Sequence, residues 1–350
     1  MNKNYYIDDK SRRKRSASQK RRRRRRRTSS KIAALLICFV LMIGVGIVGF
    51  VLWQEYSQNY IQQYEYAEYN KELISGELFA EDLCVAAQDV SLDGIETDPS
   101  LHGAGLFDLT NSDVKYGYKM FDQLYPASTT KIMTAYLALK YGNLDDVVTM
   151  SADSTNFNWD ESTCGLAEGD SLTLYDLVCG LMLQSGNDCA AAIAEHISGS
   201  QEAFAEKMNA EAKQLGATGT HFVNPHGLHD EEHYTTAYDL YLMFEAALED
   251  QTFLDIISMK SYTASVTSAD GTVYTADWSA TNYYSNGTTT PPDGIHVYGG
   301  KTGTTDQAGN CVILYEKNAA GNPYISVIMG ASDKPLLYEE MNELLMKGMK

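Results

Sequence analysis

Tyr125-Pro-Ala-Ser-Thr-Thr-Lys-Ile-Met-Thr134 is the stretch of this 350-residue chain that most constrains its fold. Pro126 suits the entry to a helix, and an apolar helical run follows from Thr129 to Lys140. Ser128 and Lys131 lie three residues apart, so on a helix the lysine amine can reach the serine hydroxyl. A serine becomes a nucleophile when a base takes its proton, and an amine with a depressed pKa can do this. A capping serine beside a surface lysine is the ordinary explanation for such a pair taken alone.

Two further short motifs follow in order along the chain. Ser185-Gly186-Asn187 lies between two predicted helices, and Lys301-Thr302-Gly303 lies at the end of a predicted strand. Each triplet alone is weak evidence at average composition. The ordered set of a helix start, a loop and a strand is typical of class A β-lactamases and penicillin-binding proteins.

Hydrophobic periodicity predicts strands near both ends of the globular part and helices between them. The predicted strands are Cys84–Val90, Gly103–Leu109, Val114–Met120, Tyr262–Tyr274, Val297–Thr302, Asn310–Lys317 and Tyr324–Ala331. The predicted helices are Thr129–Lys140, Leu172–Leu183, Ala190–Ile197, Gln201–Leu215, Thr236–Leu248 and Leu336–Met349. This order favours an α/β domain whose antiparallel sheet is formed by both chain ends, flanked by helices, with an inserted all-helical lobe.

Charge divides the chain into four predicted parts. Residues 1–31 carry a net charge of +13 and form a basic cytoplasmic tail. Residues 32–53 are uncharged and are about the length of one transmembrane helix. Residues 54–80 are expected to be a juxtamembrane stalk, and residues 81–350 a catalytic domain. Residues 54–350 together carry a net charge of −31.

The basic flank also predicts the location of the protein. Cations on the N-terminal side of the span favour a single-pass protein of the cell membrane, with its N-terminus in the cytoplasm and its catalytic domain outside. A cleaved signal peptide is less favoured, because the apolar run is longer than a usual signal core. The run from Lys20 to Arg27 could bind anionic lipid or nucleic acid. The adjoining span favours lipid, and an acidic ectodomain would be repelled by nucleic-acid phosphates, so no nucleic-acid partner is expected.

Neither the cysteines nor the histidines form a recognisable metal motif. Beyond Cys38 the chain has an odd number of cysteines, at positions 84, 164, 179, 189 and 311, with no C-x-x-C spacing. Disulfides are possible in an exported domain, but the sequence does not assign a pairing. His226, His229 and His233 lie beside acidic residues, yet their spacing is poor for zinc. We therefore expect no metal and no cofactor.

At its three motifs the chain resembles the serine-type D-Ala-D-Ala carboxypeptidases, the low-molecular-mass penicillin-binding proteins. The resemblance covers about residues 84 to 350. It includes the nucleophile segment 125–134, Gly165-Leu-Ala-Glu-Gly169, Leu183-Gln-Ser-Gly-Asn-Asp188, Phe222-Val-Asn-Pro-His-Gly-Leu228, His233-Tyr-Thr-Thr-Ala-Tyr-Asp239 and the run from Gly300 to Cys311. The resemblance implies a β-lactamase/DD-peptidase-like fold, peptidoglycan stem peptides ending in D-Ala-D-Ala as substrate, and β-lactams as inhibitors.

The resemblance also implies catalytic roles. Ser128 is expected to attack the carbonyl between the two D-alanines, with Lys131 as its general base. Ser185 would relay a proton to the leaving amine, and Asn187 would hold Lys131 and the substrate amide. Backbone N–H groups of Ser128 and Thr304 would form the oxyanion hole.

Binding of the substrate carboxylate falls, by the same resemblance, to the Lys301-Thr302-Gly303-Thr304 run, where a cation and hydroxyls suit an anion. Residues 54–350 contain no arginine, so any arginine that relatives use for this task is missing.

Three other functions remain open. A class A-like β-lactamase would share the three motifs, but residues between Asn187 and Lys301 lack the Glu-x-x-x-Asn element that such enzymes use for deacylation. A transpeptidase would differ only in using an amine acceptor in place of water. A non-catalytic module that senses cell-wall peptides or β-lactams need not keep a nucleophile and a base together.

Overall fold

The computed structural model describes Gly46 and residues 83–349. The predicted tail, membrane span and stalk, residues 1–31, 32–53 and 54–80, lie outside the described residues except for Gly46. Within the described part of the chain, no helix has both the length and the apolar character needed to cross a bilayer.

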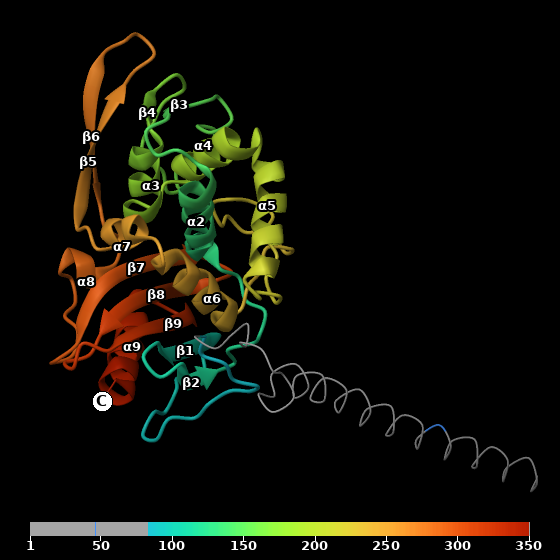
Figure 1. The fold of residues 1–350 in the computed structure, drawn as a ribbon, viewed down its shortest axis with the longest axis vertical. Helices are drawn as coiled ribbons and strands as arrows, with labels where there is room; N and C mark the ends of the chain where they lie inside the picture. The colour runs from blue at the N-terminus through green and yellow to red at the C-terminus, as the bar shows by residue number, and fades with distance from the viewer. Residues whose placement is uncertain (1–45, 47–82, 350) are drawn as a thin grey trace, which may run out of the picture. The chain divides into compact units, whose positions relative to one another are not determined.

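A five-stranded antiparallel sheet forms the base of the domain (Figure 1). Its order is β2 (Asp113–Tyr118), β1 (Gly103–Asp108), β9 (Pro323–Ala331), β8 (Gly309–Lys317) and β7 (His296–Thr305). The first strand of the domain thus pairs with its last strand. This confirms the prediction of an antiparallel sheet built from both chain ends.

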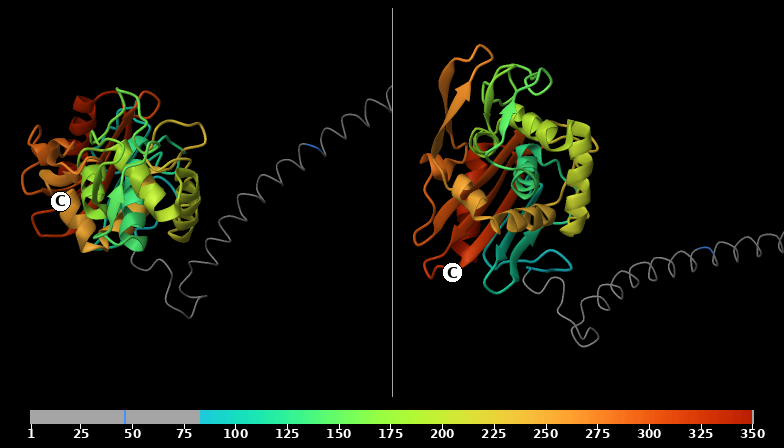
Figure 2. Two further views of the ribbon diagram at one scale, coloured as in Figure 1. Left: turned by 90° about the horizontal axis from the view of Figure 1, so that it is seen from above. Right: turned by 45° about the horizontal axis from the view of Figure 1, so that its top comes forward.

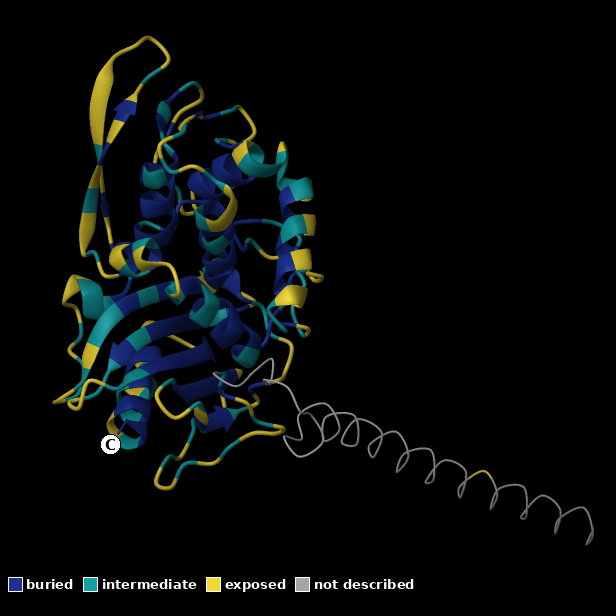
Figure 3. Cartoon of the chain, in the orientation of Figure 1, coloured by how far each residue is buried: buried dark blue, intermediate teal, exposed yellow. Residues whose placement is uncertain are grey.

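Alternating side chains of this sheet enter two separate cores. Val312 and Leu314 of β8 face α9 (Lys334–Gly348), which packs against β8 and β9. Ile313, from the opposite face of β8, joins the larger core on the side of α6 (Ala237–Leu248). Figure 3 shows these central strands as almost wholly buried. A strand covered on both faces is expected to be apolar at nearly every position, as β8 and β9 are.

Most of the remaining helices form the upper part of the domain, and the short helix α8 (Tyr283–Asn286) lies beside β7 (Figures 1 and 2). Those of the upper part are the short helix η1 (Ala127–Thr130), α2 (Lys131–Tyr141), α3 (Leu174–Leu183), α4 (Asn187–Ser198), α5 (Gln201–Gln214) and α7 (Gln251–Ile257). Side-chain caps fix several starts. Thr173 and Asp176 form a reciprocal capping box at α3, which satisfies backbone donors that a helix start leaves unpaired.

The inserted lobe is not all-helical, and that prediction was wrong. It contains a second antiparallel sheet in the order β3 (Val147–Thr149), β4 (Ser171–Thr173), β5 (Ser261–Thr267) and β6 (Val273–Ser279). Strands of three residues, such as β3 and β4, are too short to show a periodic pattern.

The single strand predicted over Tyr262–Tyr274 is also wrong, because it is the hairpin of β5 and β6. Gly271 has a φ of +85° in the turn between them, and Asp270 accepts a hydrogen bond from the Thr272 amide at 2.9 Å. Such a turn ends one strand and starts the next. The tip of this hairpin is exposed (Figure 3).

Cys84–Val90 is not a strand either. The Cys84 amide donates to the Tyr241 hydroxyl at 2.8 Å, so a side chain takes the place of a neighbouring strand. Val90 exchanges two backbone hydrogen bonds with Gly117, but no ladder develops from them.

Glu316 is a charged residue type at a buried position of the sheet. It is fully buried on the face of β8 that packs against α9, and neither of its carboxylate oxygens makes a hydrogen bond to a described residue. Burial raises the pKa of Glu316 well above its ordinary value, and the neighbouring Ser326 hydroxyl offsets only part of this rise. A carboxyl group in such a place costs stability whenever it must ionise.

We predict that Glu316→Gln raises the melting temperature at pH 8 by at least about 3 °C and changes it little near pH 4. The pKa is higher in the folded chain than in the unfolded one, so the penalty is absent below the unfolded pKa. It grows as pH rises towards the folded pKa. Thermal unfolding followed by circular dichroism at several pH values measures this. Glu339→Gln, at an exposed position of α9, is the matched control. An equal gain at both pH values would contradict the explanation.

Candidate active site

Ser128 lies in the tight turn η1 that leads into α2, and two glycines from distant segments enclose this turn. A Cβ on Gly303 of β7 would lie 2.9 Å from both the Pro126 oxygen and the Ser128 nitrogen. A Cβ on Gly227 would lie 1.9 Å from the Ala127 oxygen, and Gly227 has a φ of +86°. Only glycine fits at these two positions. The nucleophile therefore sits between the edge strand of the sheet and the loop around Gly227.

Lys131 points its amine at Ser128 from the first turn of α2. Lys131 Nζ lies 2.9 Å from Ser128 Oγ, 2.8 Å from Asn187 Oδ1 and 2.6 Å from the His226 carbonyl oxygen. In the neutral amine, two N–H groups can donate to the amide oxygen and the carbonyl, which directs the nitrogen lone pair at the Ser128 hydroxyl. This is the geometry that a general base requires.

The protonation state of Lys131 suits the same role. Complete burial lowers the pKa of Lys131 from 10.5 to about 7, and the negative charge of Asp188 partly opposes this fall. Asp188 is itself buried, and its carboxylate accepts hydrogen bonds from the backbone of Cys164, Leu166 and Cys189. At neutral pH a substantial fraction of Lys131 is therefore uncharged and able to take a proton.

Ser185 and Lys301 form the second half of the site. Lys301 Nζ donates to Ser185 Oγ at 2.9 Å and to the Thr302 carbonyl at 2.9 Å. Burial and the nearby Lys131 both lower the pKa of Lys301 well below its ordinary value. Ser185 has a φ of +65°, a left-handed conformation that is uncommon for a residue other than glycine. Such strain occurs at functional positions where the surrounding contacts hold it in place.

The two threonines of β7 also have partners. Thr302 Oγ1 lies 2.7 Å from Thr281 Oγ1, and Thr304 Oγ1 donates to Asn310 Oδ1 at 3.1 Å. Thr304 is exposed. β7 is the last strand in its sheet, so one of its edges pairs with β8 and the other faces the nucleophile turn. An open edge of this kind can pair with an extended peptide.

The structure thus brings Ser128, Lys131, Ser185, Asn187 and Lys301 into one cluster, with the Thr302-Gly303-Thr304 run along its border. Three contributors were not singled out by the sequence analysis: Asp188, Thr281 and the carbonyl of His226. Asp188 directly follows the Ser-Gly-Asn triplet, and this adjacency was the signal that could have identified it.

His226 and His233 have structural roles. His233 Nδ1 accepts from the Val223 amide at 3.0 Å, which places the proton of a neutral ring on Nε2, 2.8 Å from Thr130 Oγ1. His226 Nδ1 accepts from the Leu228 amide at 3.2 Å. Burial is the main cause that lowers the pKa of His226 to about 3 and that of His233 to about 4. Both rings are therefore neutral at pH 7.

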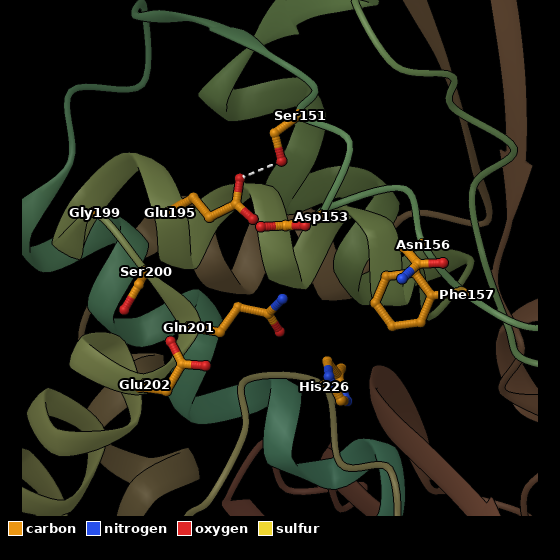
Figure 4. Close-up of a pocket in the computed structure, with 10 residues that line it drawn as sticks. All are labelled: Ser151, Asp153, Asn156, Phe157, Glu195, Gly199, Ser200, Gln201, Glu202 and His226. Atoms are coloured by element: carbon orange, nitrogen blue, oxygen red, sulfur yellow. Dashed lines mark hydrogen bonds between the residues drawn. The ribbon is translucent and has the colours of Figure 1, made fainter.

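A polar recess of about 510 Å³ lies beside His226, which is one of its lining residues (Figure 4). Asp153, Glu195 and Glu202 line it, Glu195 accepts a hydrogen bond from Ser151 at 2.7 Å, and none of the lining residues is Lys or Arg. This negative recess is unsuited to a carboxylate.

The chain is similar to known proteins over most of its described domain. The sequence model of the D-alanyl-D-alanine carboxypeptidase family matches residues 102–333. D-alanyl-D-alanine carboxypeptidase DacF of Bacillus subtilis is 38% identical over 45% of this chain and 42% of its own length. D-alanyl-D-alanine carboxypeptidase DacD of Salmonella typhimurium is 29% identical over 79% of this chain and 70% of its own length.

Solved structures agree with this similarity. The DD-transpeptidase of Streptomyces K15 superposes with a TM-score of 0.67 at 26% identity, covering 73% of this chain and 98% of that one. D-alanyl-D-alanine carboxypeptidase from Mycobacterium tuberculosis gives a TM-score of 0.65 at 28% identity, with 74% and 96% covered. The matches to curated relatives cover a smaller share of the relative's own length. The chain spans about half the length of two of these relatives.

We predict that acylation of Ser128 by a fluorescent penicillin accelerates as pH rises through about 7, because Lys131 must lose its proton to act as a base. Asp188→Asn is expected to move the midpoint of this rise to lower pH, since the negative charge that favours protonated Lys131 is removed. The rate constant for acylation between pH 5 and 9 is the measurement. Asp160→Asn, an exposed change in the segment between β3 and β4, is expected to leave the midpoint in place. A midpoint that moves to higher pH in Asp188→Asn would refute this electrostatic account.

Proposed function

This chain belongs to the D-alanyl-D-alanine carboxypeptidase family, and we propose that it is a serine DD-carboxypeptidase. The substrate would be a peptidoglycan stem peptide ending in D-Ala-D-Ala, and the reaction would release the terminal D-alanine through an acyl-serine intermediate. One observation carries the proposal above all others. The buried Lys131 amine is held by two carbonyl acceptors with its remaining position 2.9 Å from Ser128 Oγ.

In the acylation step, Lys131 takes the proton of the Ser128 hydroxyl while Oγ attacks the carbonyl carbon of the penultimate D-alanine. Backbone N–H groups of Ser128 and Thr304 would receive the developing oxyanion. Ser185, hydrogen-bonded to Lys301, would pass a proton to the leaving amine and recover the one that Lys131 took from Ser128, which returns Lys131 to its neutral form. The peptide C–N bond breaks, D-alanine departs, and the shortened peptide stays on Ser128 as an ester.

In the deacylation step, the same groups act on water. A water molecule gives its proton to the neutral Lys131 and attacks the ester carbonyl. The bond to Oγ then breaks, and Ser128 recovers a proton from Lys131. The product is a stem peptide one residue shorter, and no cofactor enters either step.

Substrate recognition is proposed to use the open edge of β7. A peptide in extended conformation would add to this edge, which supports binding through main-chain hydrogen bonds. Its terminal carboxylate would lie near Lys301, Thr302 and Thr304, where a buried cation and hydroxyls favour an anion. Because Gly303 has no side chain, β7 can pack directly against the turn that carries Ser128.

β-lactams are proposed inhibitors of the same site. A β-lactam presents a strained amide and a carboxylate, so Ser128 can open the ring as it would open the peptide bond. The leaving nitrogen remains attached to the acyl group and stays in the site, which slows the entry of water. A long-lived adduct results.

Transpeptidation is the second candidate, supported by the likeness to a structure named as a DD-transpeptidase. It shares the acylation step and differs in the acceptor, an amine in place of water. We further propose that residues 32–53 anchor the chain in the cell membrane with residues 81–350 outside, because this run is uncharged and follows a basic tail. Release of the full chain from membranes by alkaline carbonate would exclude a spanning anchor.

We predict that Ser128→Ala lowers D-alanine release from a diacyl-Lys-D-Ala-D-Ala peptide by at least about a thousandfold. Intact mass spectrometry is expected to show a stable penicillin adduct on the wild type and none on the variant. The control is Ser279→Ala, at an exposed serine of β6, which should keep both properties. A peptide amide in place of the free acid should react at least about tenfold more slowly, since a charged hydrogen-bond partner is lost.

The other outcomes separate the rival functions. Adduct formation with no D-alanine release, unless an amine acceptor is added, would identify a transpeptidase. Rapid hydrolysis of the drug without a lasting adduct would identify a β-lactamase. Intact drug and no adduct on the wild type would indicate the non-catalytic module that binds cell-wall peptides or β-lactams.

A further inference from the structure

Two cysteine thiols lie next to each other directly behind the Ser185-Gly186-Asn187 loop. The Sγ atoms of Cys164 and Cys189 lie within 4.8 Å of one another. A Cβ on Gly186 would lie 2.6 Å from Cys164 Sγ and 3.2 Å from Cys189 Sγ, and one on Gly180 would lie 2.7 and 2.9 Å from the same atoms. Both sulfurs therefore share one small space, and two glycines leave room for it.

The backbones that carry the two thiols are also held together. The amide nitrogens of Cys164 and Cys189 each donate to the same oxygen, Asp188 Oδ1, at 2.9 Å. The two nitrogens are therefore separated by at most twice that distance. The shared carboxylate therefore holds the two backbones near each other, and a disulfide requires such closeness, with Cα atoms roughly 4.4–6.8 Å apart.

The other described cysteines have different neighbours. Cys84 Sγ donates to the Asp108 carbonyl at 3.4 Å, and Cys311 Sγ donates to the Ala308 carbonyl at 3.7 Å. Cys179 lies beside Tyr175. The pair formed by Cys164 and Cys189 is thus distinct from these single buried thiols.

Metal binding is a weaker explanation for this cluster. Asp188 completes a group of three residues that could hold an ion. However, its oxygens already accept hydrogen bonds from three backbone amides. A structural zinc site normally has four protein ligands. Because the Asp188 oxygens are already engaged, only the two cysteine sulfurs would remain to bind an ion.

We propose that Cys164 and Cys189 form a disulfide that ties the loop before Gly165 to the first turn of α4, immediately behind Ser185-Gly186-Asn187. The oxidant would be a small-molecule disulfide. The Cys164 thiolate attacks one of its sulfurs and releases the first thiolate. The Cys189 thiolate then attacks Cys164 Sγ and releases the second. The two cysteines lose two protons and two electrons, and the oxidant becomes two thiols.

The exposure of the two thiols to solvent favours a first attack by Cys164 and a second by Cys189. Cys164 is partly exposed and Cys189 is fully buried, so the first attack belongs to Cys164. Burial raises the pKa of both thiols, which slows exchange in the folded chain. The disulfide should therefore form most readily before the loop is fully packed.

The crosslink would close a loop that contains β4 and α3. It would therefore reduce the number of conformations open to the unfolded chain, which stabilises the folded one. For a loop of this size, about 25 residues, we expect the oxidised protein to melt about 5–10 °C above the reduced one. The link also fixes the backbone on which Ser185 and Asn187 are carried. It acts on the site through position and makes no contact with substrate.

The test uses the full chain, equilibrated with oxidised glutathione, denatured, treated with an alkylating agent and digested without reduction. We expect a crosslinked peptide joining Cys164 to Cys189, and a melting temperature that falls by about 5–10 °C on reduction. Cys164→Ser should show neither effect, whereas Cys179→Ser, a matched buried cysteine of α3, should show both. Cys189→Ala provides a second variant if the serine does not fold.

Three results would overturn the proposal. These are full alkylation of both cysteines after oxidation, a crosslink to a different cysteine, and a bound metal ion whose removal by a chelator exposes the two thiols. None of these readouts depends on catalysis, so the test stands whether or not the chain proves to be a DD-carboxypeptidase.

Discussion

A lysine amine held out of water is the constraint on which the rest of this structure depends. Burying a charged ammonium costs several kcal/mol unless the group is neutralised or well hydrogen-bonded. Lys131 is buried completely, and its hydrogen-bond partners are Ser128, Asn187 and the His226 carbonyl. The last two lie 56 and 95 residues away in the chain. The helix start, the Ser-Gly-Asn loop and the Asn-Pro-His-Gly loop must therefore meet at one point, and the fold is arranged around that meeting.

Bringing these segments together requires backbone conformations that are locally unfavourable. Ala127 and Ser185 both have positive φ angles, +47° and +65°, which cost about 1–3 kcal/mol each in residues other than glycine. Long-range contacts hold both turns. Thr130 Oγ1 donates to the Ala127 carbonyl and is itself joined to His233, while Ser185 is joined to Lys301 of the sheet. The strain therefore lies beside the nucleophile and in the neighbouring loop, and hydrogen bonds from other parts of the domain stabilise it.

The sequence predicted those parts of the fold and site that local patterns encode. The three-residue spacing of Ser128 and Lys131 on a helix predicted their contact, and the apolar runs in β8 and β9 predicted the central strands of the sheet. Local patterns could not reveal β3 and β4, because three-residue strands show no period. They also could not distinguish Cys84–Val90 from a strand, since a Tyr241 hydroxyl far along the chain takes its hydrogen bond. Asp188 and Thr281 contribute through tertiary contacts, which cannot be predicted from the spacing of residues in the sequence.

Charge at the site differs sharply from charge on the domain as a whole. Residues 54–350 carry −31, yet the cluster contains two buried lysines, and charges in a buried setting are screened far less than charges on the surface. Burial is the main cause that lowers the pKa of Lys301, and the nearby Lys131 lowers it further, because two neighbouring ammonium groups disfavour each other's charge. A substrate carboxylate bound beside Lys301 would favour the charged form of that lysine. Charged Lys301 would in turn disfavour a proton on Lys131, so binding of an anion beside Lys301 would promote the neutral amine that the proposed mechanism requires.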